Sequence, residues 1–125
     1  MKKCGQEISI SLVLLTLLLA AAFFSKSGEA SKSGVPPGEA AALARAVGAL
    51  PNLRVRGIMG IPAPTLEAEA ARAQFRALAR CFDACREAGL AVDTLSMGMS
   101  GDLELAIAEG ATQVRVGTAI FGARK

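Results

Sequence analysis

The segment that decides the fold runs from residue 95 to residue 122 and reads LSMGMSGDLELAIAEGATQVRVGTAIFG. Its pattern is that of a strand, a tight turn, a short helix, a second strand and a second turn. The apolar run ends at Met97, and the residues 98–101 break it. Ser100 is predicted to be the N-cap of the helix, because a serine hydroxyl accepts a hydrogen bond from an orphan N–H of the first helical turn. Alternation of polar and apolar residues at 113–116 predicts the second strand.

The short helix between these strands has its own signals. Asp102 places a negative charge at the positive end of the helix dipole. Apolar residues follow at helical spacing, and Gly110 is predicted to end the helix in a left-handed conformation. Gly117 and Thr118 then form the second turn.

Both turns directly follow a predicted strand, and parallel sheets bind ligands beyond the carboxyl ends of their strands. Ser100, Gly117 and Thr118 supply hydroxyl and backbone N–H groups at that end, which suits a phosphate. In a (β/α)8 barrel, the loops after the last two strands are a frequent phosphate site. The same residues also fit two turns that only connect elements, and from these residues alone both interpretations stay open.

Helix and strand signals alternate over the rest of the chain. A helix is predicted from Pro36 to about Ala49, with Leu43, Val47 and Leu50 on its buried side. Strands are predicted at 53–61 and 92–97. This alternation predicts right-handed crossovers and a parallel sheet.

The longest predicted helix spans residues 66–88 and ends at Gly89. One of its faces is apolar at helical spacing and is expected to be buried, through Phe75, Leu78, Phe82 and Cys85. Its charged side chains lie mostly away from that face and are expected to be solvated, namely Arg72, Arg76, Arg80, Asp83 and Glu87.

Residues 8–24 form an apolar run behind Lys2 and Lys3. Three interpretations stay open for this run: an aberrant start of a truncated reading frame, a signal or membrane anchor, and a native barrel strand. The repeated tetrapeptide SKSG follows within residues 25–34 and predicts a loop. A contact with a membrane is expected only through residues 8–24.

Composition excludes several classes of function. The net charge is +3, the arginines are dispersed and the only aromatic residues are five phenylalanines, which argues against nucleic-acid binding. The chain has three cysteines and no histidine, so no metal site is expected. Cys81 and Cys85 lie four residues apart on one predicted helix and suit a reducing, cytoplasmic compartment. A membrane-anchored location is the alternative.

Several stretches resemble the pyridoxal-phosphate homeostasis proteins, the YggS-like family, whose fold is that of the alanine racemase N-terminal barrel. In chain order they are GEASKSG at 28–34, LRVRGIM at 53–59 with IP at 61–62, LSMGMS at 95–100, DLE at 102–104, AIAEG at 106–110 and VRVGTAIFGAR at 114–124. The resemblance implies an α/β fold in which residues 28–125 are the C-terminal part of a (β/α)8 TIM barrel. A complete barrel of this type takes about 250 residues, so the barrel is expected to be incomplete. Residues 1–27 do not match the family.

The resemblance also implies the binding of pyridoxal 5′-phosphate. Ser100, Gly117 and Thr118 would bind its phosphate, Arg115 would face its pyridine nitrogen, and Met99 would belong to the same site. In the resembled family a lysine at the end of the first barrel strand forms a Schiff base with the cofactor. No lysine of this chain lies in a motif that matches the one around that Schiff-base lysine, so the expected binding is non-covalent at most and no catalytic residue is predicted.

The function expected from the sequence is therefore that of a truncated cofactor-binding protein without enzyme activity. Two alternatives stay open: a remnant of a racemase-type or aldolase-type enzyme, and a small membrane-anchored protein. An incomplete barrel leaves two sheet edges, which favour aggregation or pairing with another chain.

Overall fold

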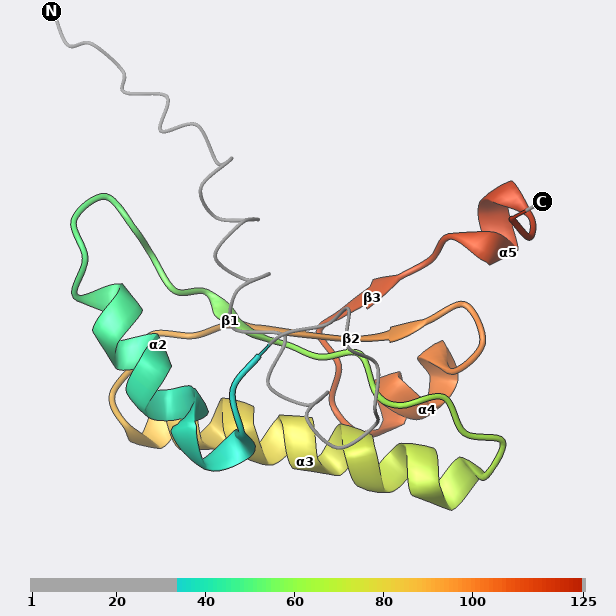
Figure 1. The fold of residues 1–125 in the computed structure, drawn as a ribbon, viewed down its shortest axis with the longest axis horizontal. Helices are drawn as coiled ribbons and strands as arrows, with labels where there is room; N and C mark the ends of the chain where they lie inside the picture. Colours follow the sequence, from blue (N-terminus) through green and yellow to red (C-terminus); the bar gives the residue numbers. More distant parts are fainter. Residues whose placement is uncertain (1–33, 125) are drawn as a thin grey trace, which may run out of the picture.

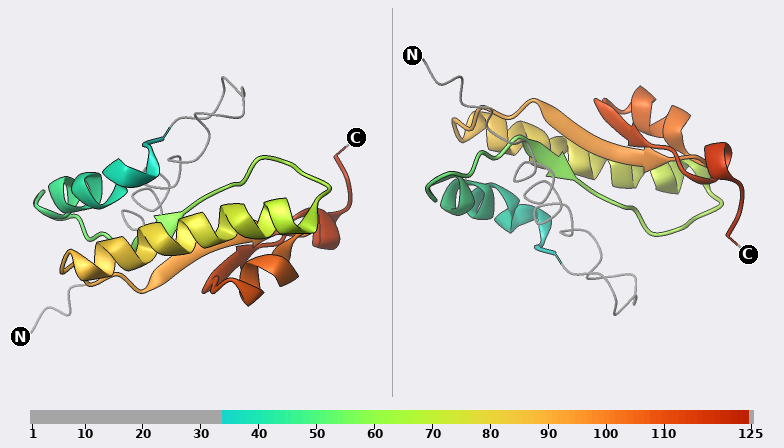
Figure 2. Two further views of the ribbon diagram at one scale, coloured as in Figure 1. Left: turned by 90° about the horizontal axis from the view of Figure 1, so that it is seen from below. Right: turned by 90° about the horizontal axis from the view of Figure 1, so that it is seen from above.

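The computed structural model describes residues 34–124. The elements in chain order are the 3₁₀ turn η2 (Pro37–Glu39), α2 (Ala40–Gly48), β1 (Gly57–Met59), α3 (Ala68–Glu87), β2 (Thr94–Met99), α4 (Leu103–Ala108), β3 (Gln113–Arg115) and α5 (Thr118–Phe121). The strands form one sheet, and α2, α3 and α4 lie on the same face of it (Figure 1; Figure 2).

The sheet has the order β1-β2-β3, and both strand pairs are parallel. In the first pair Gly57 lies opposite Thr94, and Met59 lies opposite Ser96. A further bond from Gly60 N to Ser96 O, at 3.0 Å, extends this pairing past the end of β1. The predicted fold class is confirmed: helices alternate with parallel strands, as in part of a barrel, and the sheet is not closed within residues 34–124.

The core lies between the sheet and α3. All four residues predicted for the buried face of α3 are buried, with Phe75 and Cys85 fully inaccessible. On α2 the buried residues are Ala40, Ala44 and Val47. The prediction of Leu50 as a buried residue is wrong, because α2 ends at Gly48 and Leu50 follows in the turn, where it is 52% exposed.

Two arginines of α3 are ion-paired, which corrects the expectation that they are only solvated. Arg76 Nε lies 3.2 Å from Glu109 Oε2, and Arg72 Nη1 lies 3.6 Å from Glu109 Oε1. Arg76 Nη1 also contacts Glu69 Oε1 at 2.7 Å. Glu109 follows α4 in the chain, so these pairs join α3 to the end of α4. Periodicity within one helix does not show a partner that lies 33 residues further along the chain.

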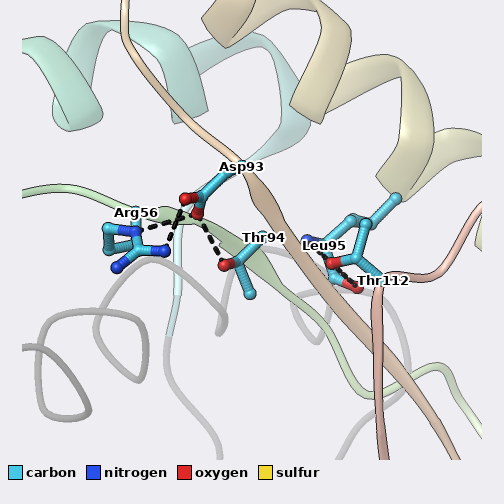
Figure 3. Close-up of polar contacts among 5 residues, drawn as sticks. All are labelled: Arg56, Asp93, Thr94, Leu95 and Thr112. Atoms are coloured by element: carbon cyan, nitrogen blue, oxygen red, sulfur yellow. Dashed lines mark hydrogen bonds and ion pairs between the residues drawn. The ribbon is translucent and has the colours of Figure 1, made fainter.

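Polar side chains hold the strands together at their amino-terminal ends (Figure 3). Arg56 precedes β1 and pairs with Asp93, which precedes β2; Arg56 Nε donates to Asp93 Oδ1 at 2.9 Å. The hydroxyl of Thr94 donates to the same oxygen at 2.8 Å. Leu95 N donates to the hydroxyl of Thr112 at 2.7 Å, and this bond fastens β2 to the residue before β3.

Strand boundaries differ from the predicted ones. The segment predicted as a strand at 53–61 is paired as a strand only over Gly57–Met59. The second strand begins and ends two residues later than predicted, at Thr94 and Met99, because the residues after Met97 remain in the sheet. No helix within residues 34–124 has the length and apolar character needed to cross a membrane. The apolar run 8–24 and the loop containing SKSG at 31–34 fall outside the described residues, apart from Gly34.

Candidate functional site

The two glycine-containing turns lie at the carboxyl end of the sheet. Ser100 directly follows β2, and Gly117 and Thr118 follow β3. The hydroxyl of Ser100 accepts hydrogen bonds from Gly117 N at 3.3 Å and from Ala119 N at 3.2 Å. A side chain of one turn therefore contacts the backbone of the other. Because the hydroxyl accepts in both bonds, its own hydrogen is left for a third group.

This contact corrects the prediction that Ser100 is the N-cap of the following helix. The N-cap of α4 is Asp102, and no side chain within the described residues caps it. Asp102 Oδ1 instead accepts a bond from Met99 N at 2.7 Å and closes the turn between β2 and α4. The prediction failed because it counted only the local donors of α4, whereas the fold presents Ser100 with donors that lie 17 and 19 residues further along the chain.

Arg115 crosses the sheet from β3. Its Nη2 atom donates to Gly60 O at 2.8 Å, and its Nη1 atom lies 3.5 Å from the hydroxyl of Ser96. Its Nε atom is buried and has no hydrogen-bond partner within the described residues. Burial lowers the pKa of Arg115, an effect that the negative charge of Asp102 opposes. The result is a half-buried cation. Its two hydrogen-bond acceptors, Gly60 O and the Ser96 hydroxyl, are neutral, and its Nε–H remains for a further acceptor.

Two hollows adjoin the turn after β2, and no residue of the turn after β3 lines either of them. The smaller one, of about 350 Å³, is lined by residues 100–105. The larger one, of about 660 Å³, lies between residues 61–68 and the start of α4, and Met99, Gly101, Asp102 and Leu105 line its other side. The side chain of Gln74 fixes the loop that borders the larger hollow: Ala63 N donates to Gln74 Oε1 at 2.7 Å, and Gln74 Nε2 donates to Ala63 O at 3.2 Å.

The structure brings some of the predicted site residues together and leaves others apart. Ser100 contacts Gly117 directly, and Thr118 is the next residue in the same turn. Arg115 contacts Ser96 and Gly60, and Met99 borders the larger hollow with 43% of its surface exposed.

Sequence reasoning missed Ser96, Gly60 and Ala119 as partners of the site. One signal was present in the sequence, because Ser96 interrupts a run of apolar strand residues. Within residues 34–124 no group of three or more potential ligands is arranged to hold a metal ion.

The model of one protein family, described as alanine racemase, N-terminal domain, matches residues 26–125 of this chain. The chain therefore belongs to this family, which confirms both the predicted resemblance and the predicted fold. The match covers the sheet, its helices and both turns.

Curated relatives carry the name pyridoxal phosphate homeostasis protein. The relative from Pseudomonas aeruginosa is 60% identical over 98 residues, which are 78% of this chain and 41% of the relative. The relative from Escherichia coli K12 is 51% identical over the same share of this chain and 42% of its own length. The chain thus spans about two fifths of the length of the curated relatives that it matches.

Two solved structures are similar as well. One is PipY of Synechococcus elongatus, solved with PLP bound; it is 37% identical, with a TM-score of 0.65 over 72% of this chain and 43% of PipY. The other is a protein described as unknown from Bifidobacterium adolescentis, 44% identical, with a TM-score of 0.69 over 76% of this chain and 39% of that protein.

Proposed function

We propose that this chain binds pyridoxal 5′-phosphate non-covalently at the carboxyl end of its sheet and catalyses no reaction. The relatives named above support this proposal, since their name gives a role in homeostasis and no reaction. PipY, which was solved with PLP bound, supports the choice of ligand. The observation that carries the proposal is the bond of the Ser100 hydroxyl to the turn that follows β3.

The phosphate would bind between these two turns. Gly117 N and Ala119 N already donate to Ser100 Oγ, and Ile120 N and Phe121 N donate to Gly117 O. The hydrogens that remain for a phosphate oxygen are therefore the hydroxyl hydrogens of Ser100 and Thr118 and the backbone N–H of Thr118. In this proposal Gly117 acts indirectly, by fixing the hydroxyl of Ser100.

The ring of the cofactor would lie toward Arg115. A half-buried guanidinium with an N–H group left to donate suits an unprotonated ring nitrogen, which accepts a hydrogen bond. The bound cofactor supplies an electron sink in general, and a cation beside the ring nitrogen weakens that property. Met99 borders the larger hollow and would contact the ring from the side.

We infer non-covalent binding from the positions of the lysines in the given sequence. Lys2, Lys3, Lys26, Lys32 and Lys125 lie in none of the motifs that match the family's Schiff-base lysine. We also place the chain in a reducing compartment such as the cytoplasm, because the two core cysteines, Cys81 and Cys85, are free thiols.

The test is a titration of the full chain with pyridoxal 5′-phosphate and, separately, with pyridoxal, followed by the circular dichroism that the bound ring acquires. We expect binding of the phosphorylated form only. The double variant Ser100→Ala/Thr118→Val should weaken that binding by at least about a hundredfold, because it removes two hydroxyl donors to a charged group, each worth about 1.5–3 kcal/mol.

The matched control is Thr94→Val, which makes the same isosteric change at the opposite end of the sheet, where the Thr94 hydroxyl donates to Asp93. It should leave the affinity unchanged. Treatment of the complex with borohydride should give no stoichiometric adduct in the intact mass. Equal binding by the parent chain and the Ser100→Ala/Thr118→Val variant would refute the proposed site, and a stoichiometric adduct would refute non-covalent binding.

A further inference from the structure

The strand β2 contains one residue more than its neighbour over the stretch that leads to Ser100. Ser96 lies opposite Gln113, whereas Met99 lies opposite Arg115. Three steps along β2 therefore match two steps along β3. This is the arrangement of a β-bulge, which bends a strand and redirects the side chains that follow it.

The extra residue changes which face of the sheet the following side chains occupy. Leu95 and Met97 are buried in the core on the helix side, so alternation places Ser96 on the other face, where it meets Arg115. Gly98 should return to that face but does not. A Cβ atom built on Gly98 points at α4, at 2.5 Å from Ala106 Cβ and 3.3 Å from Leu103 Cα.

Two consecutive residues, Met97 and Gly98, thus lie on the helix side of the sheet, and Met99, which lies opposite Arg115, returns to the face of Ser96 and Arg115. Uniform pairing would set Gly98 opposite Arg115 and turn Met99 toward α4. The extra residue also delays the end of β2 by one position, and so determines where Ser100 meets the turn after β3.

Only glycine fits this position. The φ angle of Gly98 is +92°, where side chains of L residues are strained, and the space for a Cβ is already filled by Ala106. Both conditions fall on the same residue, which is two positions before Ser100.

We propose that Gly98 is a positioning residue: its bulge sets Ser100 against the backbone of Gly117 and Ala119 and sets Met99 on the face of Arg115. The role of this arrangement in holding a cofactor rests on the proposed function. The arrangement itself concerns only residues of this chain and is measurable without any cofactor.

The experiment is hydrogen–deuterium exchange of the full chain without cofactor, read by mass spectrometry on peptides that contain the amides of residues 117–121. In the parent chain Ser100 protects the amides of Gly117 and Ala119. The variant Gly98→Ala should speed their exchange about five- to tenfold, as expected for one lost hydrogen bond, relative to the amides of α3 in the same sample.

The matched control is Gly110→Ala. Gly110 also has a positive φ angle, +101°, but a Cβ there meets nothing within 4 Å. This variant introduces the same kind of backbone strain at a position away from the two turns. It should leave unchanged the ratio between the amide exchange rates of residues 117–121 and those of α3. If Gly98→Ala and Gly110→Ala shift that ratio equally, Gly98 has only a structural role and the proposal fails.

Two further variants keep the proposal testable if Gly98→Ala does not fold. Ser100→Ala removes the acceptor without touching the bulge and should expose the same two amides; unchanged protection there would overturn the proposal. Gly98→Ala/Ala106→Gly removes the overlap with Ala106, and it should recover stability while the two amides remain exposed. If the parent chain binds no pyridoxal 5′-phosphate, the proposed function fails, and the exchange comparison still decides the role of Gly98.

Discussion

Gly60 and Leu78 pack closely at the end of β1, so substitutions at these two residues should have coupled effects on the free energy of unfolding. A Cβ on Gly60 would lie 2.5 Å from Leu78 Cδ1, which is closer than real Cβ contacts come, and 3.0 Å from Leu78 Cγ, which is tighter than nearly all of them. Leu78 is 1% exposed, so it has little room to move. The variant Gly60→Ala should therefore lower the free energy of unfolding by about 1–3 kcal/mol through overpacking. The variant Leu78→Ala should lower it by about 2–5 kcal/mol through loss of buried surface and the cavity that remains.

The double variant decides whether this account is right. In Gly60→Ala/Leu78→Ala the new methyl group enters the space left by the leucine. The double variant should therefore lose less free energy of unfolding than the two single variants lose together, by about 0.5–3 kcal/mol. The chain has no Trp or Tyr, so urea unfolding is followed by far-ultraviolet circular dichroism. The control Gly101→Ala, where a Cβ meets nothing within 4 Å, should change stability by less than about 0.5 kcal/mol. Additive losses in the double variant would show that Gly60 and Leu78 do not meet.

Three further predictions concern pH, thiol reactivity and association. The hydrogen bond from Arg56, and then that from Thr94, hold the pKa of Asp93 below its usual value. A carboxylate with a depressed pKa contributes its full stabilisation only above the pKa of the unfolded state. The melting-temperature difference between the parent chain and Asp93→Asn should therefore be present at pH 7 and shrink below about pH 4. A difference that stays constant across this range would contradict the prediction. Burial raises the pKa values of Cys81 and Cys85, so their alkylation should require unfolding and accelerate with urea, and labelling as fast as in a free peptide would be inconsistent with a buried pair. The outer strands β1 and β3 are each paired on one side only within residues 34–124, so the isolated chain should associate or aggregate, and a monomer with a cooperative melting transition in analytical ultracentrifugation and calorimetry would disprove this.

The parts of the fold that depend on local patterns were predictable. The buried face of α3 follows from the spacing of Phe75, Leu78, Phe82 and Cys85, since a helix repeats every 3.6 residues. Gly89 and Gly110 were expected to end helices, and both have positive φ angles. The parallel order of the strands follows from the alternation with helices.

The features that depend on distant partners were not predictable. The local sequence predicts Ser100 as the cap of the nearest helix, but its donors lie in the turn after β3. Arg76 was expected to be solvated, but the fold brings Glu109 to it. Gly98 was interpreted as the end of a strand, because a glycine that breaks a strand and a glycine that bulges it look the same in a single sequence. The resemblance to a known family names the candidate site residues, and the structure adds the contacts that hold them.

The amide of Gln74 has a consequence for how the rim of the larger hollow is encoded. This side chain accepts a hydrogen bond from the N–H of Ala63 and donates one to its C=O, as the backbone of a neighbouring strand would. The path of the loop 61–67 is therefore specified by α3 as well as by the prolines within it. Changes in size beside Ala63 should therefore move the loop little, whereas Gln74→Glu would remove the donor and set a carboxylate against a carbonyl oxygen. We therefore expect side chains on this rim to be replaceable as long as Gln74 holds the backbone at Ala63.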